Sequence, residues 1–457
     1  MQKWQKLSII FLVSISFMFA LNLFKSSRNK NRVDLSQTKF QVDYFKLDNG
    51  MEVLIIPNSR VPAVMHMLWY KVGGIDEKLG KTGLAHYLEH LMFHGTEKYA
   101  KDEMDKQVSD FGGSHNAFTS YDFTAYYQNL PKQYLEGVMD MESDRMRGLV
   151  LEEEQTKTER NIVLEERLMR RDNSPRAVLG EKIREALVGK EHPYGRPLIG
   201  YEDDIEGLTH QDALDFYNKY YFPNNTVLVL AGDITKEEVE PLIEKYYGVI
   251  PKGPELKVTM AEEVSKPLKQ KVEHSDKNTS NVEIKYAYLA PDLLSVEKKH
   301  AYALSLISYL LADTKTSVLY KKLVLEEDLA ISVSSSYSDM SRGQAFFEID
   351  VVLKDPKNEE KVFQYINEAL EDLRLGRLQK DNLERAKNLF LIETIYSKES
   401  YKSLAYIVGM NYTTGISLEE ILNWDDNIMQ VTKDDIFEAA EYVFQDEKRV
   451  IGYLLPE

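Results

Sequence analysis

The sequence has no cysteine among its 457 residues. Disulfide bonds and every thiolate-based zinc site are therefore excluded. A transition metal bound by this chain must be held by histidine, aspartate or glutamate side chains. The lack of thiols also means that an oxidising compartment outside the cytoplasm would impose no redox cost on the protein.

Positive charge is also scarce, because 57 Lys and Arg residues face 74 Asp and Glu residues, which gives a net charge of −17. Phosphate backbones attract cations, so this balance argues against a nucleic-acid partner. Hydrophobic residues make up 43% and charged residues 29% of the chain, a balance typical of folded globular proteins. The length exceeds what one hydrophobic core usually spans and predicts several domains.

The N-terminus carries the pattern of an export signal. Lys3 and Lys6 precede an uncharged apolar run, Leu7–Phe24, and a basic stretch follows it. A positive segment before an apolar run directs export, and this run reaches the lower length limit for crossing a bilayer. No good cleavage site follows, so late cleavage and an uncleaved membrane anchor are both open. We expect residues 1–37 to be this signal or anchor plus a linker, and the protein to be periplasmic or anchored to the inner membrane facing the periplasm.

The remaining chain shows two successive series of strand and helix patterns. In the first half we expect strands at 45–57 (a hairpin around Asn49-Gly50), 64–72, 117–130 and 225–231, and helices at 84–93, 152–171 and 201–221. In the second half we expect strands at 282–289, 329–353 (a pair) and 449–455, and helices at 298–311, 359–375 and 379–396.

The similar order of elements in the two halves predicts a duplicated unit rather than a doubly wound parallel sheet. A stretch punctuated by Lys and Pro, at 251–267, is typical of a linker. We therefore expect an α+β fold with two homologous domains, each a mostly antiparallel sheet packed against helices. Residues 38–255 would form the first, catalytic domain, and residues 256–457 would form a homologous companion domain without a metal.

The first half contains the run HYLEH, which has the spacing of a metal site. His86 and His90 are four residues apart, so on a helix both imidazoles project from one face, one turn apart. Two nitrogen ligands in this arrangement suit zinc. Glu89 lies near the same metal, where its carboxylate would accept a proton from the attacking water and deliver it to the leaving amine. The alternative is an ordinary polar helix face with two solvated histidines.

A catalytic zinc site usually has a third protein ligand. His94 is on the same face, but it lies roughly 12 Å along the helix from His86, so three imidazoles cannot reach one ion. We expect His94 to be a capping or surface residue. The charged helix of the first half offers Glu159 and Glu166, seven apart on one face, and Glu165, which points about 100° away from Glu166. Helical spacing alone leaves the choice between these carboxylates open.

The chain contains, in this order, the segments GKTGLAHYLEHLMFHGT, GGSHNAFTSYDFTAYY, HPYGRPLIG, YYFPNNTVLVLAGDI and SVLYKKL. In the same order they resemble segments of the pitrilysin/insulinase family of inverted zinc peptidases, and in particular of its short bacterial members that are similar to processing peptidases. The resemblance covers the chain from Gln41 to the C-terminus. It implies one Zn²⁺ per chain, with His86, His90 and Glu166 as ligands and Glu159 as the support of Glu166.

The same resemblance implies a peptide-binding strand. In the family, the segment GGSHNAFTSYDFTAYY corresponds to an edge strand with which an extended substrate pairs. Asn116, Ala117 and Phe118 would then contact the substrate, mostly through their backbone. The chain departs from the family at the Arg and Tyr that hold the peptide, seven residues apart. They align with Val324 and Ile331, and neither side chain can do this. We therefore expect a homologous metal-free partner subunit that supplies the pair, with a homodimer as the alternative.

These patterns together predict a zinc metalloendopeptidase that acts on peptides or extended protein segments, with Glu89 as the general base. Two alternatives belong to other classes. One is a non-catalytic assembly or chaperone subunit that retains the fold. Such chains typically have broken metal motifs, whereas His86, Glu89, His90 and Glu166 are all present here. The other is a metal-dependent hydrolase of non-peptide substrates.

Overall fold

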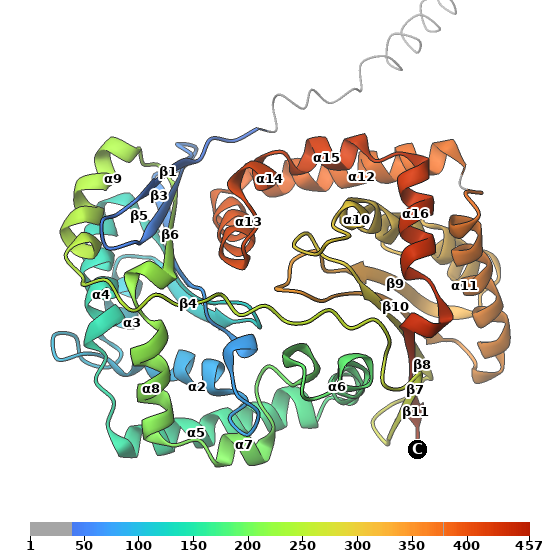
Figure 1. Cartoon of the computed structure of the whole chain (residues 1–457), viewed down its shortest axis with the longest axis horizontal. Helices are drawn as coiled ribbons and strands as arrows, with labels where there is room; N and C mark the ends of the chain where they lie inside the picture. The colour runs from blue at the N-terminus through green and yellow to red at the C-terminus, as the bar shows by residue number, and fades with distance from the viewer. Residues whose placement is uncertain (1–38, 378) are drawn as a thin grey trace, which may run out of the picture. The chain divides into compact units, whose positions relative to one another are not determined.

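The computed structural model describes residues 39–377 and 379–457, so the predicted signal or anchor, Leu7–Phe24, lies outside the described residues. Within the described part of the chain, no helix is both long enough and apolar enough to cross a membrane. Gln41–Glu457 forms one compact unit, which contains two sheets with helices packed against them (Figure 1). The expected α+β fold with two sheet-and-helix domains is confirmed.

The first sheet has six strands in the order β1-β2-β6-β3-β5-β4. All neighbouring strands are antiparallel except β2 and β6. Its strands are β1 (Asp43–Lys46), β2 (Glu52–Pro57), β3 (Ala63–Tyr70), β4 (Ser114–Thr119), β5 (Thr124–Pro131) and β6 (Thr226–Gly232). The edge position of β4 matters for the site, because it leaves one side of this strand without a partner strand in the described chain.

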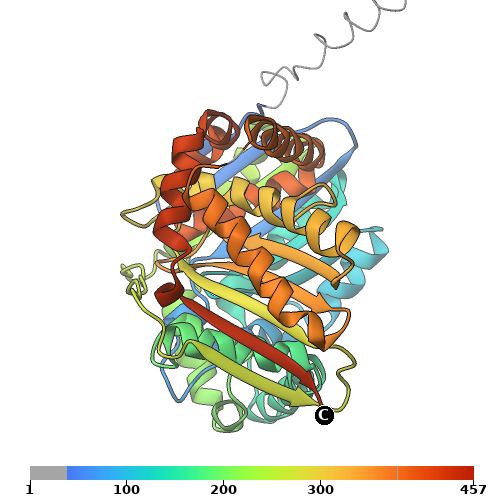
Figure 2. The same cartoon turned by 90° about the vertical axis from the view of Figure 1, so that its right-hand side faces the viewer.

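The second sheet has five strands in the order β7-β11-β8-β10-β9. Only β7 and β11 pair in parallel, and Figure 2 shows β11, in red, between β7 and β8. The strands are β7 (Lys271–Asp276), β8 (Glu283–Ala290), β9 (Ala330–Tyr337), β10 (Ala345–Leu353) and β11 (Arg449–Pro456). Each sheet therefore has one parallel pair among antiparallel ones.

The helices follow the two halves of the chain. In the first half they are α2 (Leu84–Leu91), α3 (Glu103–Asp110), α4 (Leu135–Gly148), α5 (Glu153–Arg167), α6 (Pro175–Val188), α7 (Glu202–Glu206), α8 (His210–Tyr220) and α9 (Lys236–Ile243). In the second half they are α10 (Lys299–Leu311), α11 (Glu359–Arg374), α12 (Lys380–Glu399), α13 (Tyr401–Thr414), α14 (Leu418–Leu422), α15 (Trp424–Gln430) and α16 (Lys433–Val443).

The first hairpin forms as its turn sequence predicts. β1 and β2 pair on either side of Asn49-Gly50, and Gly50 has a φ of 94°, which a side chain would disfavour. The Asn49 side-chain amide donates to the carbonyl oxygens of Tyr247 and Ile250, at 2.7 and 2.9 Å. The turn is thereby tied to the end of the first half of the chain.

The stretch 117–130, predicted as one strand, is in fact two strands, β4 and β5, joined by a tight turn. The backbone N–H of Ser120 donates to the carbonyl of Phe123 at 2.8 Å and closes that turn. The alternation of polar and apolar residues continues through the turn, so periodicity did not reveal the reversal. The hairpin turns β4 back along β5, at the edge of the sheet.

Each half of the chain contributes one helix to the sheet of the other half (Figure 1). Helix α6 packs on β7 and β11 of the second sheet, where Leu179 and Ile183 join a buried apolar cluster with Val450 and Leu454. Helix α13 packs on β3 and β6 of the first sheet. The two halves are therefore not separate bodies, and the bounds 38–255 and 256–457 stay a prediction.

The contact between α13 and the first sheet is close. A Cβ atom added to Gly409 would lie 2.2 Å from Nε1 of Trp69, which is fully buried on β3. The Tyr412 hydroxyl donates to Glu52 Oε1 on β2 at 3.0 Å, and the Tyr401 hydroxyl donates to Asn129 Oδ1 on β5. Only glycine at position 409 lets the helix backbone approach the indole this closely.

Replacing Gly409 with alanine should lower the free energy of unfolding by about 1–3 kcal/mol or more, because the added methyl group overpacks a closed interface. The measurement is a urea unfolding curve followed by tryptophan fluorescence. The matched control is Gly137→Ala in α4, where an added Cβ meets nothing within 4 Å and alanine favours the helix. Equal stability of the two variants would contradict the packing of α13 against Trp69.

Candidate metal centre

Helix α2 presents the residues of HYLEH, and its N-terminus is fixed by the side chain of Glu77, which precedes the helix. Glu77 accepts hydrogen bonds from the backbone N–H groups of Gly83 and Ala85, at 2.9 and 2.8 Å. Gly83 precedes the helix with a φ of 84°, and a Cβ there would lie 2.3 Å from the carbonyl oxygen of Ile199. The helix therefore begins at one defined place, which fixes the direction of the side chains that follow.

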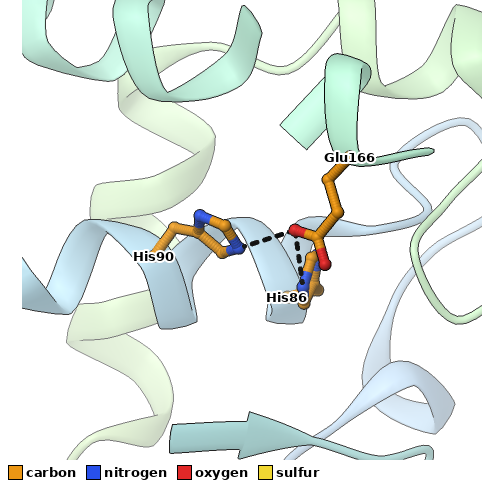
Figure 3. A group of neighbouring side chains, drawn as sticks. All are labelled: His86, His90 and Glu166. Carbon is orange, nitrogen blue, oxygen red and sulfur yellow. Dashed lines mark ion pairs between the residues drawn. The ribbon is translucent and has the colours of Figure 1, made fainter. Parts of the chain in front are cut away.

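His86, His90 and Glu166 converge although they come from two different helices (Figure 3). One ligand atom from each residue lies within 4.8 Å of the others. Glu166 Oε2 is 3.2 Å from His90 Nε2 and 3.7 Å from His86 Nε2. Ligands bonded to one tetrahedral zinc ion at about 2.0–2.2 Å are about 3.4 Å apart. Two imidazole nitrogens and one carboxylate oxygen at these separations fit a zinc ion.

Glu159 lies behind this group and holds His90. Its Oε1 is 2.9 Å from His90 Nδ1, and its Oε2 is 3.0 Å from His94 Nε2. Since a carboxylate accepts, His90 donates from Nδ1, and its Nε2 is left as the nitrogen that faces Glu166 and can bind a metal. The spacing placed Glu159 and Glu166 on one face of a helix, and both face α2. Glu165 is exposed.

The expectation that His94 is a capping or surface residue is wrong. Its side chain is buried, and it donates to Glu159 instead of solvent. It is not part of the group formed by His86, His90 and Glu166. The α-helix ends at Leu91 and a tighter 3₁₀ turn, Met92–His94, follows it up to Gly95. The tighter turn and the contact with Glu159 draw His94 inward.

The charges of the centre are strongly coupled. Hydrogen bonds from His90 and His94 lower the pKa of Glu159 to about 2. Burial disfavours charge on His90, but its hydrogen bonds to Glu159 and Glu166 outweigh this and raise its pKa to about 9. Burial and the neighbouring His90 lower the pKa of His86 to about 4. Without a metal, His90 is thus the imidazole that favours the positive charge, and it lies between the carboxylates of Glu159 and Glu166. A position between two carboxylates suits a cation.

Glu89 lies beside the three converging residues, on the same helix as His86 and His90. Its side chain is buried, and the Thr119 hydroxyl of β4 donates to its Oε2. Burial raises the pKa of Glu89 above its ordinary value, which suits a group that must both accept and release a proton near neutral pH. Thr119 fixes one carboxylate oxygen and leaves the other available.

A cavity of about 680 Å³ opens over this centre. Its lining includes His86, Glu89, His90 and Glu166 together with Asn116, Ala117 and Phe118 of the edge strand β4. The Phe118 ring stacks on Tyr406 of α13 at a centroid distance of 5.5 Å. The three residues expected to contact a substrate thus border the same space as the candidate ligands, and α13 holds one of their side chains.

Val324 and Ile331 lie elsewhere. Neither lines this cavity. Val324 packs against the core of the second sheet, and Ile331 is 52% exposed at the start of the edge strand β9. The two positions that align with the family's arginine and tyrosine therefore hold apolar side chains that lie outside the cavity.

The contact between α2 and α5 has its own anchors. The Tyr87 hydroxyl of α2 donates to the carbonyl oxygen of Thr156 in α5. At its C-terminal end α5 is tied instead to the loop before α7, because the Arg167 guanidinium donates to the carbonyl of Gly200 at 2.6 Å. Sequence reasoning missed these residues and also missed Glu77 and Thr119. Tyr87, Thr119 and Arg167 contact segments that are distant in sequence. Glu77 contacts the nearby backbone N–H groups of Gly83 and Ala85, which no regular spacing connects to it.

Two family models match the chain in succession. The model described as "Insulinase (Peptidase family M16)" matches residues 52–202, and the one described as "Peptidase M16 inactive domain" matches residues 207–390. The residues of the centre, from Glu77 to Glu166, all fall in the first match. The match to the inactive domain begins beyond the candidate ligands.

Named relatives agree with these matches. The zinc protease PqqE of Helicobacter pylori is 28% identical over 90% of this chain and 92% of its own length. The mitochondrial-processing peptidase subunit beta of Saccharomyces cerevisiae is 25% identical over 88% of each chain. Among solved structures, the periplasmic protease PqqL from Escherichia coli has a similar fold, with a TM-score of 0.74 and 19% identity over 91% of this chain and 47% of that one.

Burial raises the pKa of Glu77 from 4.5 to about 8, although the two backbone donors and Arg196 favour its charged form. Because the folded-state pKa is the higher one, the folded chain binds more protons between these values. The contribution of Glu77 to the free energy of unfolding is therefore greatest below about pH 4.5 and falls as the pH rises towards about 8. Glu77→Gln, which cannot titrate, should remove this part of the pH dependence.

The measurement is a set of urea unfolding curves of the parent and Glu77→Gln from about pH 5 to about pH 8, with a chelator present so that metal binding does not contribute. The parent should lose stability relative to the variant as the pH rises. Parallel pH profiles would show that Glu77 is already ionised throughout and that its amide contacts dominate over burial.

Proposed function

Because the chain belongs to the M16 (insulinase) family of peptidases, we propose that it is a zinc-dependent endopeptidase that hydrolyses peptide bonds in peptides or extended protein segments. The observation that carries the proposal is the convergence of His86, His90 and Glu166 at zinc-ligand separations, with Glu89 buried beside them. In the described part of the chain these three form a single such group, which supports one Zn²⁺ per chain.

In the proposed mechanism, His86, His90 and Glu166 hold the zinc ion. Zinc bound there supplies a Lewis acid that makes water more acidic and polarises the scissile carbonyl. Glu89 accepts the proton of the attacking water and transfers it to the nitrogen of the leaving amine. Thr119 keeps the Glu89 carboxylate in one orientation through its hydrogen bond.

Glu159 and β4 complete the assignment. Glu159 fixes the ring of His90 by accepting from Nδ1, which makes it a positioning residue for that ligand. The free edge of β4 would pair with the extended backbone of a substrate through Asn116, Ala117 and Phe118. This edge borders the cavity above the candidate ligands, so a paired peptide would pass over the centre.

A partner subunit is the second part of the proposal. The chain has Val324 and Ile331 where the family has the arginine and tyrosine that grip the peptide. We propose that a homologous metal-free subunit supplies these groups, or a second copy of the chain as a homodimer. The similarity to one subunit of the yeast mitochondrial-processing peptidase supports a paired arrangement. A purely non-catalytic role is less well supported, because the inactive-domain match does not include the candidate ligands.

Export to the periplasm is also proposed. It is supported by the positive and then apolar N-terminal sequence up to Phe24 and by the fold shared with a protease described as periplasmic. The absence of cysteine is compatible with this compartment.

Two substitutions separate metal binding from chemistry. His86→Ala removes one ligand and should lose zinc and peptidase activity together. Glu89→Gln keeps the ligands and should retain zinc but lower turnover by about 100-fold or more. Zinc content by elemental analysis and cleavage of a quenched fluorescent peptide, before and after chelation, are the measurements.

The matched control is His274→Ala on β7, which removes a histidine outside the centre and should leave zinc content and activity unchanged. Normal turnover by zinc-loaded Glu89→Gln would contradict the role of Glu89 as the general base. Undiminished zinc content in His86→Ala would contradict the ligand assignment.

The dependence of activity on subunit concentration tests the partner. If a second copy completes the site, the specific activity of the purified chain should rise with its concentration. If a metal-free homologue completes it, activity should stay low at every concentration until that subunit is added. Full specific activity that is independent of concentration and of any added subunit would show that the chain works alone, and would overturn this part of the proposal.

A further inference from the structure

The cavity above the centre has a group of cations that the proposed mechanism does not use. Arg170 and Arg171 lie on a short π-helical segment, Leu168–Asp172, which continues directly from helix α5. Both line the cavity, as does Lys101. The segment begins two residues after Glu166, so its arginines are close to the place where a bound peptide would be cut.

The π-helical segment is held firmly in place. Next to it, Arg167 is buried, and its guanidinium contacts the carbonyl of Gly200 at 2.6 Å, Asp172 at 3.2 Å and Glu181 at 3.3 Å. The backbone N–H of Asn173 donates to the carbonyl of Leu168 at 2.9 Å. The two arginines that follow Arg167 therefore extend from a fixed base.

The two arginines differ in their partners. The guanidinium of Arg170 is 2.8 Å from Glu166 Oε1, and its side chain is 76% exposed. Arg171 is half-buried, and in residues 39–377 and 379–457 its guanidinium has no carboxylate within ion-pair distance. Arg171 therefore retains the capacity to form a paired, two-point contact with a carboxylate.

The charge balance of the cavity favours an anion. Three carboxylates line it, those of Glu89, Glu159 and Glu166, and three cationic side chains, those of Lys101, Arg170 and Arg171. A divalent metal held by the centre adds positive charge that no further carboxylate of the lining offsets. The whole chain carries a net charge of −17, so this positive region is local and not a general property of the surface.

From this arrangement we propose that Arg171 binds a carboxylate of the substrate close to the scissile bond, so that the site prefers peptides that are acidic there. The inference rests on the proposed function and deepens it. Arg171 is five residues beyond Glu166, roughly 7 Å along a helix, and an extended peptide advances about 3.3–3.6 Å per residue. The carboxylate should therefore lie within about two or three residues of the cut, as an acidic side chain or as a free C-terminus.

The test measures binding separately from turnover. Zinc-loaded Glu89→Gln protein is titrated with labelled peptides in pairs, one pair with Glu or Gln within three residues of the cleaved bond, the other with a free or amidated C-terminus there. Fluorescence anisotropy gives each Kd. The acidic member of a pair should bind about tenfold more tightly or better, as expected for a hydrogen bond to a charged group. The Arg171→Gln substitution in the same background should reduce that ratio to about one.

Three further variants separate the contact from general effects. Arg176→Gln removes an equal charge from nearby α6, outside the cavity lining, and should keep the preference. Arg171→Lys keeps the charge but not the two-point geometry, and should give an intermediate ratio. Arg171→Gln in the otherwise unchanged chain should retain zinc and keep the urea unfolding midpoint of the parent, which would show that it is folded.

Each outcome has a distinct meaning. A preference in only one of the two peptide pairs identifies the side chain or the C-terminus as the source of the carboxylate. Equal binding of acidic and neutral peptides, no binding of either by the chain alone and with a partner, or a preference that survives Arg171→Gln would overturn the inference. Failure of the parent chain, alone and with a partner, to cleave any peptide with zinc would instead overturn the proposed function, because the binding assay does not require turnover.

Discussion

The contact between helices α2 and α5 is the constraint on which the centre depends. A zinc ligand must lie about 2 Å from the ion, yet the histidines and Glu166 come from helices that are distant in sequence. Glu77 fixes where α2 begins, Tyr87 ties it to α5, and Glu159 joins the two helices through His90 and His94. These residues determine whether the three ligand atoms meet.

Much of the fold could be predicted from local pattern, because strands and helices repeat their apolar residues with different periods. The hairpin around Asn49-Gly50 and the helix that presents His86 and His90 are examples. The turn between β4 and β5 was missed because the alternation runs through it. The packing of α6 and α13 on the sheet of the other half could not be predicted. Periodicity shows which face of a helix is apolar but not which sheet it will cover.

The candidate site shows the same division. Helical spacing placed His86 and His90 on one face but left three glutamates open as a third ligand. The family resemblance favoured Glu166, and the structure brings Glu166 to the histidines while Glu165 is exposed. His94 was expected at the surface and is buried, because its partner Glu159 comes from the other helix. Thr119 carries no local signal of its contact with Glu89, which only the fold creates.

The packing of α13 on the first sheet also affects the order in which parts of the chain can fold during synthesis. The face of the first sheet that carries Trp69 is covered by residues 401–414, close to the end of the chain. During synthesis this face stays open until almost the whole protein has emerged, since nothing earlier in the described chain takes the place of α13. Its Phe118 contact with Tyr406 forms at the same late stage. The surroundings of the edge strand β4, which we propose as the peptide-binding strand, are thus completed late. An unfinished chain would carry the HYLEH helix without the finished surface proposed to bind a substrate.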